Sequence, residues 1–165
     1  MDENTKLDSL DKILYVSINS YKKVLEVEPE NDRAILYMID AYKALAKPYF
    51  DMERNLDFLA LKGKYKAESD RLKNEGNKRL EDALVYAKGY KNMKGENISE
   101  DEINSLYPVF SIAEDYESLI SILSISIKRD STNMEYLEVL RNAYIKVKDF
   151  ESAENIYQII LKNEN

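Results

Sequence analysis

The 165-residue chain contains neither cysteine nor histidine. Without cysteine it has no disulfide framework, no thiolate nucleophile and no zinc–thiolate site. Cysteine usage therefore does not indicate whether the protein works in an oxidising or a reducing compartment. Without histidine it lacks the usual general base and the commonest transition-metal ligand, which excludes histidine-dependent triads and most zinc or iron sites. Catalysis would have to rest on carboxylates, lysines or tyrosines alone. We therefore predict a protein that is not an enzyme and that uses no metal, no cofactor and no small-molecule substrate.

Glycine and proline are scarce as well, with 4 and 3 residues, so the chain has few points at which to turn. This favours long regular segments, and the composition leans helical. No apolar run approaches the roughly 18 residues of a membrane span, and Met1 is not followed by a signal-peptide pattern. We expect no membrane insertion and a cytoplasmic location by default. A signal or lipid anchor upstream of Met1 would instead make the protein periplasmic or membrane-anchored.

Positive charge is in the minority, with 24 basic against 31 acidic residues and a net charge of −7. This balance opposes non-specific attraction to nucleic-acid phosphates and anionic lipids, so we expect no nucleic-acid partner. One stretch, "LKGKYKAESDRLKNEGNKR" at 61–79, is locally basic. It could dock an acidic partner or a phosphate backbone, but we favour a solvated helix face with i,i+4 pairs such as Lys66 with Asp70.

What the chain does contain is a repeat of 34 residues. "EDYES" at 114–118 returns as "KDFES" at 148–152, and seven apolar residues of one copy have apolar counterparts in the other. Spacings of three, four and seven predict two amphipathic helices in each copy, separated by a break at Asp115 or Asp149 that also begins the second helix. The apolar pairs are Ile103 and Leu137, Leu106 and Leu140, Phe110 and Tyr144, Tyr116 and Phe150, Leu119 and Ala153, Leu123 and Tyr157, and Ile127 and Leu161.

The first helix of each copy has a start signal of the capping-box form, in which Ser or Thr is followed three residues later by Glu. The two signals are Ser99 with Glu102, and Thr132 with Glu135. Each copy is therefore predicted to be a helix–turn–helix pair. The chain length suits one core, so we predict a single domain over residues 1–165.

A helix–turn–helix period of 34 residues resembles the tetratricopeptide repeat (TPR) family. The copies at 99–131 and 133–163 match the family best, and residues 14–46 also match it, through Tyr21, Val24, Leu25 and Pro29. Residues 33–92 form more divergent helical hairpins. In the last copy, the family's positions on the two helices are occupied by Leu137, Leu140, Tyr144, Ala153 and Tyr157.

The resemblance implies a TPR-like right-handed α-solenoid, in which antiparallel helix pairs stack on one another. We predict an all-α fold without strands and with one long helix in the middle, opened by Pro48. The eight predicted helices cover roughly 7–27, 33–46, 49–75, 78–92, 100–113, 116–129, 134–147 and 150–163.

Proteins of this family hold a peptide or a partner's helix in a concave groove lined by first helices, and the resemblance implies the same scaffold or adaptor function here. For any single position, a solvated helix face is the alternative reading. A clamp for chaperone carboxylates is not expected, because only Asn142 of the clamp residues is present and Glu138 would repel a carboxylate. The residues predicted to line the groove are Tyr37, Asp40 and Lys43, then Asn104 and Ser105, then Glu138, Asn142 and Ile145.

The last helix carries apolar residues over an arc of roughly 200°, twice the width of one buried stripe. Terminal repeats normally need a polar outer face, so we predict an edge interface at Ile156, Ile159 and Ile160. A partner protein, a second copy in a homodimer or residues 7–25 of the same chain would cover it. The alternative function is a structural subunit or a self-associating component of a bacterial cell-envelope or secretion assembly. The bias toward Asn, Lys and Ile suggests the bacterial origin.

Overall fold

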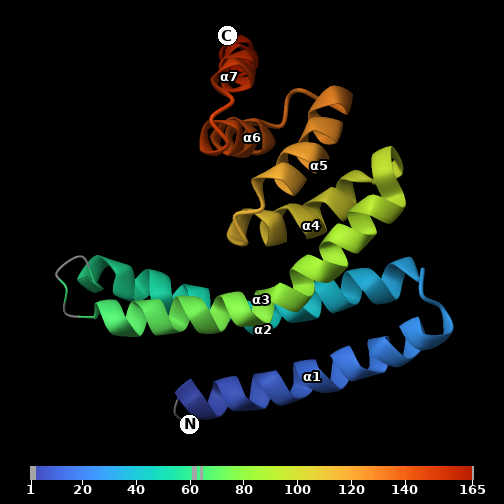
Figure 1. Cartoon of the computed structure of the whole chain (residues 1–165), viewed down its shortest axis with the longest axis vertical. Coiled ribbons are helices and arrows are strands. Elements are labelled where there is room, and N and C mark those ends of the chain that lie inside the picture. Colours follow the sequence, from blue (N-terminus) through green and yellow to red (C-terminus); the bar gives the residue numbers. More distant parts are fainter. Residues whose placement is uncertain (1–2, 61–62, 64, 165) are drawn as a thin grey trace. The chain divides into compact units, whose positions relative to one another are not determined.

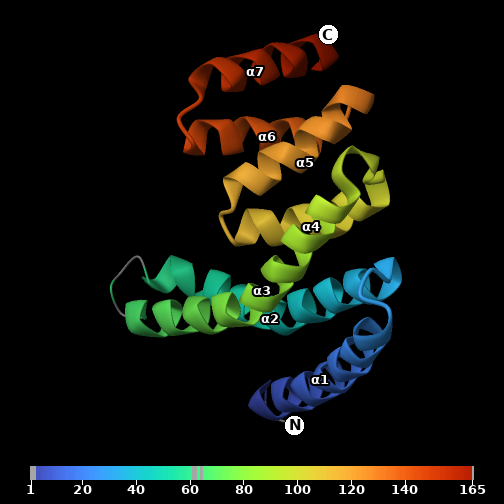
Figure 2. The same cartoon turned by 45° about the vertical axis from the view of Figure 1, so that its right-hand side comes forward.

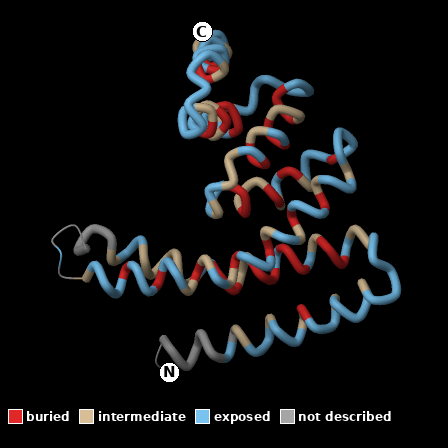
Figure 3. The backbone as a smooth tube through the Cα atoms, in the orientation of Figure 1, coloured by how far each residue is buried: buried red, intermediate tan, exposed pale blue. Residues whose placement is uncertain are grey.

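The computed structural model describes the backbone of residues 3–60, 63 and 65–164, and within these ranges every regular element is a helix. The predicted all-α class is therefore confirmed. Where the sequence predicts a single domain, the chain divides into two compact units, residues 1–90 and 91–165. Figure 1 shows the helices of both units, and each unit has buried residues of its own (Figure 3), among them apolar side chains.

The N-terminal unit consists of α1 (Glu3–Val27), α2 (Asp32–Ala60) and most of α3 (Lys66–Lys94). α1 and α2 run antiparallel and pack along each other (Figures 1 and 2). Their connection is short because Asn31 caps α2: its Oδ1 accepts a hydrogen bond from the Ala34 N–H at 3.0 Å. The core of this unit includes the fully buried side chains of Ile18, Met38 and Leu45.

In the described part of the chain, seven α-helices stand where the sequence predicts eight. The predicted boundaries at 46–49 and 75–78 are wrong, since Pro48 lies inside α2 and Gly76 lies inside α3. Ala46 is a strong helix former and is buried, so α2 continues through Pro48 at the loss of one backbone hydrogen bond. The chain turns instead near Gly63, whose φ of +73° is a left-handed conformation that glycine adopts without steric cost.

α2 and α3 form an antiparallel hairpin with a close approach near its middle (Figures 1 and 2). A Cβ atom placed on Gly76 would lie 2.9 Å from Cε1 and Cζ of the Phe50 ring. Nearer the loop, Ser69 Oγ donates to Glu53 Oε1 at 3.0 Å. Glycine at position 76 is therefore what allows the Phe50 ring to lie against the α3 backbone.

The C-terminal unit contains the end of α3, a short 3₁₀ helix η1 (Gly95–Asn97), α4 (Glu100–Ile112), α5 (Tyr116–Arg129), α6 (Met134–Lys146) and α7 (Phe150–Glu164). α4 packs on α5 and α6 packs on α7 as two helix pairs, and α5 also packs on α6 (Figure 2). The bounds of these four α-helices agree with the predicted ones to within one residue. Three of the seven predicted apolar pairs are buried in both copies, whereas Phe150 and Tyr157 are exposed.

The tight turns inside the two helix pairs have the same backbone geometry at the 34-residue interval. The Asp115 N–H donates to the Phe110 carbonyl at 2.9 Å, and the Asp149 N–H donates to the Tyr144 carbonyl at 2.9 Å. Each is the i+5 bond of a Schellman motif, which closes the end of the first helix. Both aspartates then cap the second helix as predicted, because their Oδ1 atoms accept a hydrogen bond from the N–H three residues later.

Each of these turns places a non-glycine residue in the left-handed conformation, Glu114 at φ 56° and Lys148 at φ 64°. Such a conformation costs an L-residue about 1–2 kcal/mol, most of which glycine avoids. We expect Glu114→Gly and Lys148→Gly each to raise the free energy of unfolding by about 0.5–1 kcal/mol, measured by urea denaturation. Glu154→Gly, inside α7, is the matched control and should lower it by about 1 kcal/mol. Destabilisation by all three variants would contradict the prediction.

The capping box predicted for α4 is confirmed. Ser99 Oγ accepts from the Glu102 N–H, and the Glu102 carboxylate accepts from the Ser99 N–H. The box predicted for α6 is wrong, because the cap is Asn133, whose Oδ1 accepts from the Tyr136 N–H at 3.1 Å. Thr132 lies one residue too early, and asparagine is a better N-cap than threonine.

Candidate functional site

In the C-terminal unit, the first helices of the two pairs, α4 and α6, are in direct side-chain contact. Tyr107 on α4 donates to Glu135 Oε1 on α6 at 2.5 Å, and Tyr136 on α6 donates to Asn104 Oδ1 on α4 at 2.5 Å. The two tyrosine rings meet edge to face, with centroids 5.2 Å apart. These crossed bonds fix the spacing of α4 and α6. We refer to the surface that α4 and α6 share around these four residues as the first-helix face.

Both phenols of the first-helix face are held in the neutral form. The hydrogen bond to Glu135, together with burial, raises the pKa of Tyr107 to about 12. Burial, followed by the charges of Glu100 and Glu135, raises the pKa of Tyr136 to about 12. An unperturbed tyrosine has a pKa of about 10, so both groups keep their protons, and Tyr107 keeps its donor role, well above neutral pH.

This predicts a loss of stability in alkali. Between pH 10 and about 12 the folded unit binds more protons than the unfolded chain, so the stabilisation is complete below pH 10 and is lost as the pH rises through about 12. We expect the urea midpoint to fall between pH 9 and pH 11, and to fall less in the Tyr107→Phe, Tyr136→Phe double variant. Tyr157→Phe, at an exposed tyrosine, is the control. An equal fall in all three proteins would contradict the assignment.

Five of the residues predicted to line a groove lie on α4 and α6. Asn104 is joined to α6 through Tyr136, as described. Ser105 is half-buried on α4. The exposed members of the set are Asn104, Glu138, Asn142 and Ile145. The structure thus leaves four of the five accessible on these two helices.

The other three predicted residues lie on α2 in the N-terminal unit. Tyr37 is half-exposed and stacks on the Tyr21 ring of α1, with centroids 5.3 Å apart and an interplanar angle of 24°. Lys43 Nζ lies 2.8 Å from Asp40 Oδ1, one turn away on the same helix. Tyr37 therefore packs against α1, and Asp40 forms an ion pair with Lys43.

Three residues of the first-helix face were missed by the sequence reasoning, namely Tyr107, Glu135 and Tyr136. Their bonds cross from one helix to the next, and no local spacing predicts such a pair. A weaker signal was present: Glu135 and Asp101 occupy the same position of the 34-residue repeat, and both are acidic and exposed.

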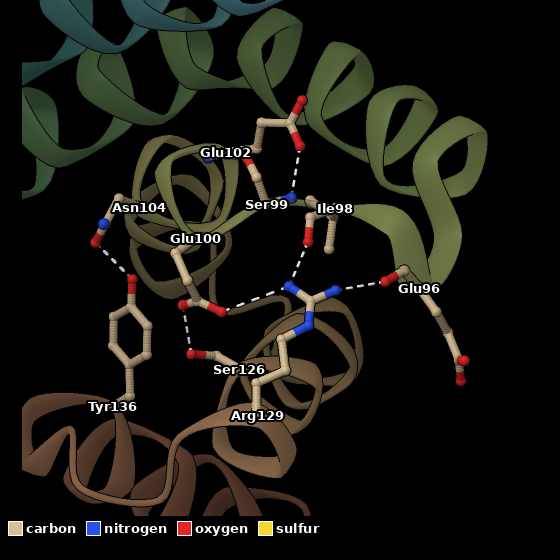
Figure 4. Close-up of polar contacts among 9 residues, drawn as sticks. All are labelled: Glu96, Ile98, Ser99, Glu100, Glu102, Asn104, Ser126, Arg129 and Tyr136. Atoms are coloured by element: carbon tan, nitrogen blue, oxygen red, sulfur yellow. Dashed lines mark hydrogen bonds and ion pairs between the residues drawn. The ribbon is translucent and has the colours of Figure 1, made fainter.

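A second polar cluster joins the end of α5 to the start of α4 (Figure 4). The Arg129 guanidinium donates to the Ile98 carbonyl at 2.5 Å and to the Glu96 carbonyl at 2.5 Å. It also lies 3.5 Å from Glu100 Oε1, while Ser126 Oγ donates to Glu100 Oε2 at 2.6 Å. Arg129 therefore binds the segment that leads into α4, and its role in this arrangement is structural.

The edge interface predicted on α7 is not an exposed face. Ile156 and Ile160 are only 8% and 6% exposed, and Ile159 is half-buried, all within this chain. The repeat gives the reason: Ile156 corresponds to Ile122 of α5, which is completely buried. This position of the 34-residue repeat is therefore buried against other helices of the same chain in both copies.

The side of α7 around Tyr157 carries polar side chains. Leu123 is completely buried on α5, whereas its counterpart Tyr157 is 37% exposed. The Arg141 guanidinium lies 4.9 Å from the centroid of the Tyr157 ring. Beside it on α7, Gln158 donates to Glu154 at 2.7 Å. The exposed ring of Tyr157 is thus surrounded by polar and charged groups.

Among the residues that the structure describes, no group of three or more acidic side chains is placed to hold a metal ion. None of the described helices is both long and apolar enough to cross a membrane.

No family model, no curated protein and no solved structure matches this chain.

Proposed function

We propose that this protein is an interaction scaffold of the TPR kind, whose helix pairs stack as a right-handed solenoid and whose first-helix face binds an extended peptide of a partner protein. The observation that carries the proposal is the side-chain contact between α4 and α6 through Tyr107, Glu135, Tyr136 and Asn104. The 34-residue repetition of turns and caps supports the stacking of the two pairs. Extended surfaces of this type are the usual binding surfaces of repeat proteins.

The chemistry of the first-helix face favours a basic peptide. Asp101 on α4 and Glu135 and Glu138 on α6 are exposed acids, and the whole chain has a net charge of −7. Attraction between opposite charges speeds association and favours partners of complementary charge. A peptide that contains Lys or Arg would carry the positive charge that complements these acids. Asn142 adds an exposed amide that can bind peptide backbone, and Ile145 adds an exposed apolar contact.

The crossed tyrosine bonds also reduce the cost of binding. Tyr107 is half-buried and already hydrogen-bonded across the two helices, so its side chain has little freedom left to lose when a peptide binds. Tyr136 is only 2% exposed and contributes by holding α4 and α6 together. Tyrosines that are apolar at the ring and polar at the tip are frequent at such interfaces.

The proposal can be tested by selecting random phage-displayed peptides on the immobilised protein. We expect the selected peptides to carry Lys or Arg, and their affinity, measured by fluorescence polarisation, to fall roughly tenfold in Glu138→Lys. Glu117→Lys, at an exposed acid on the second helix α5, introduces the same charge change and should alter the affinity less than about twofold. No enrichment over an unrelated protein, or equal losses in the two variants, would overturn the proposal.

A further inference from the structure

α1 is the structural counterpart of α5, three repeat periods earlier in the chain. α1 ends at Val27 and α5 at Arg129, which is 102 residues later, and the helices that follow begin at Asp32 and Met134, again 102 residues apart. The caps agree as well: Asn31 and Asn133 each accept a hydrogen bond from the N–H three residues later.

The contacts of α1 with α2 also match those of α5 with α6. Ser124 on α5 lies 3.5 Å from the Tyr144 hydroxyl on α6. The corresponding pair, Lys22 and Tyr42, joins α1 to α2, with the ammonium 6.0 Å from the ring centroid. α1 is therefore the second helix of a helix pair, and α2 begins like the first helix of the next one.

α5 uses one face to pack against α4, the first helix of its own pair. Ser126 and Arg129 on this face bind the start of α4, and Ser118 and Ile122 are buried on it. The corresponding residues of α1 are Val16, Ser20, Val24 and Val27. The described part of the chain has no helix before α1 that could play the role of α4.

Figure 3 shows that most described residues of α1 are exposed, and those on this face are largely aliphatic. Val16, Val24 and Val27 are 68%, 39% and 82% exposed, and Ile13, which extends the same line, is 66% exposed. Ile18, on the side toward α2, is 1% exposed. We call Ile13, Val16, Ser20, Val24 and Val27 the α1 stripe; at 100° per residue they span an arc of about 80°.

The spacing of the α1 stripe is symmetric. Counted from Ser20, its members lie at −7, −4, +4 and +7, so the sequence positions are the same in both directions. Two antiparallel copies related by a two-fold axis at Ser20 would therefore place Val16 opposite Val24 and Ile13 opposite Val27. The smallest residue would lie at the crossing, where two helices approach most closely.

We propose that a second copy of this chain covers the α1 stripe, forming a dimer through antiparallel α1 helices. The second copy supplies to α1 the kind of apolar helix face that α4 supplies to α5. The stripe spans 15 residues, roughly 21 Å of helix, which places the interface at the low end of specific protein–protein interfaces. The dimer is consequently a weak one that forms with rising concentration.

The first test is the solution mass of the intact protein, measured by light scattering from about 5 to about 500 μM. We expect the mass to rise from that of one chain toward that of two, and to stay at one chain in the Val16→Lys, Val24→Lys double variant. The control is Val85→Lys on α3, because Val85 is 68% exposed, like Val16. Circular dichroism of each variant checks that the helices remain folded.

The second test uses the absence of natural cysteine. In Ser20→Cys the only thiol would face its own copy across the two-fold axis, so mild oxidation should cross-link it at least tenfold faster than Val85→Cys. A wild-type mass of one chain at the highest concentration overturns the proposal and leaves a helix of another protein as the occupant. A dimer that survives Val16→Lys, Val24→Lys overturns it too, as does equal cross-linking of the two thiols.

Discussion

Replacing Arg129 by methionine is expected to lower the free energy of unfolding by about 2 kcal/mol, because two charge-assisted hydrogen bonds to backbone carbonyls are lost. The guanidinium side chain is 40% exposed, so water compensates part of the loss and the figure is smaller than for a buried pair. The Ile98 carbonyl would lose its bond from Arg129, whereas the Glu100 carboxylate would keep the bond from Ser126. For a unit of this size, the midpoint of thermal unfolding should fall by roughly 10 °C.

Lys128→Met is the matched control for this variant. Lys128 is the other basic residue in the last turn of α5 and is exposed, so its replacement removes the same charge from the same helix end. We expect a loss of only about 0.3–0.5 kcal/mol from the helix dipole. If the two variants unfold at the same temperature, the contacts of Arg129 with the segment before α4 do not stabilise the protein.

Replacing Gly76 by leucine should separate α2 from α3. Leucine normally favours a helix interior by up to about 1 kcal/mol over glycine. At this position, however, even a Cβ atom would lie 2.9 Å from the Phe50 ring, so the ring or the helix has to move. Overpacking of this kind costs about 1–3 kcal/mol, and we expect a net loss of about 2 kcal/mol in urea denaturation.

Gly89→Leu provides the control on the same helix, because no heavy atom lies within 4 Å of the corresponding Cβ position. It should stabilise the protein by about 0.5–1 kcal/mol. Combining Gly76→Leu with Phe50→Ala should cost less than the sum of the single variants, since the smaller side chain makes room for leucine. Equal stabilisation by the two leucine variants would show that the Phe50 ring moves aside freely.

The C-terminal unit was predicted closely because its signals are local. A helix begins where an Asp, Asn or Ser side chain can accept a hydrogen bond from the N–H three residues later, and such caps are visible in the sequence at Ser99, Asp115 and Asp149. The miss at Thr132 has the same local nature, because the adjacent Asn133 is an equally available cap. The 34-residue interval then related the helix bounds of one pair to those of the other.

The helix boundaries in the middle of the chain were predicted poorly, because the local signals there point to the wrong positions. Pro48 and Gly76 usually interrupt helices, yet α2 and α3 pass through them. In α3 the reason is tertiary, since Gly76 is needed for the approach of Phe50. A residue type that weakens an isolated helix can thus be the one that permits two helices to pack.

The sequence by itself determined the all-helical class, the 34-residue repeat and the residues that start and end the C-terminal helices, since caps and apolar periodicity act within one or two turns of backbone. Only the tertiary structure decided which sides of those helices are covered. It buried Ile156 and Ile160 within the chain, left Val16 and Val24 uncovered on α1, and joined Tyr107 to Glu135 across two helices. The burial of a side chain depends on the helix that lies opposite, and a helix's own sequence does not contain that information.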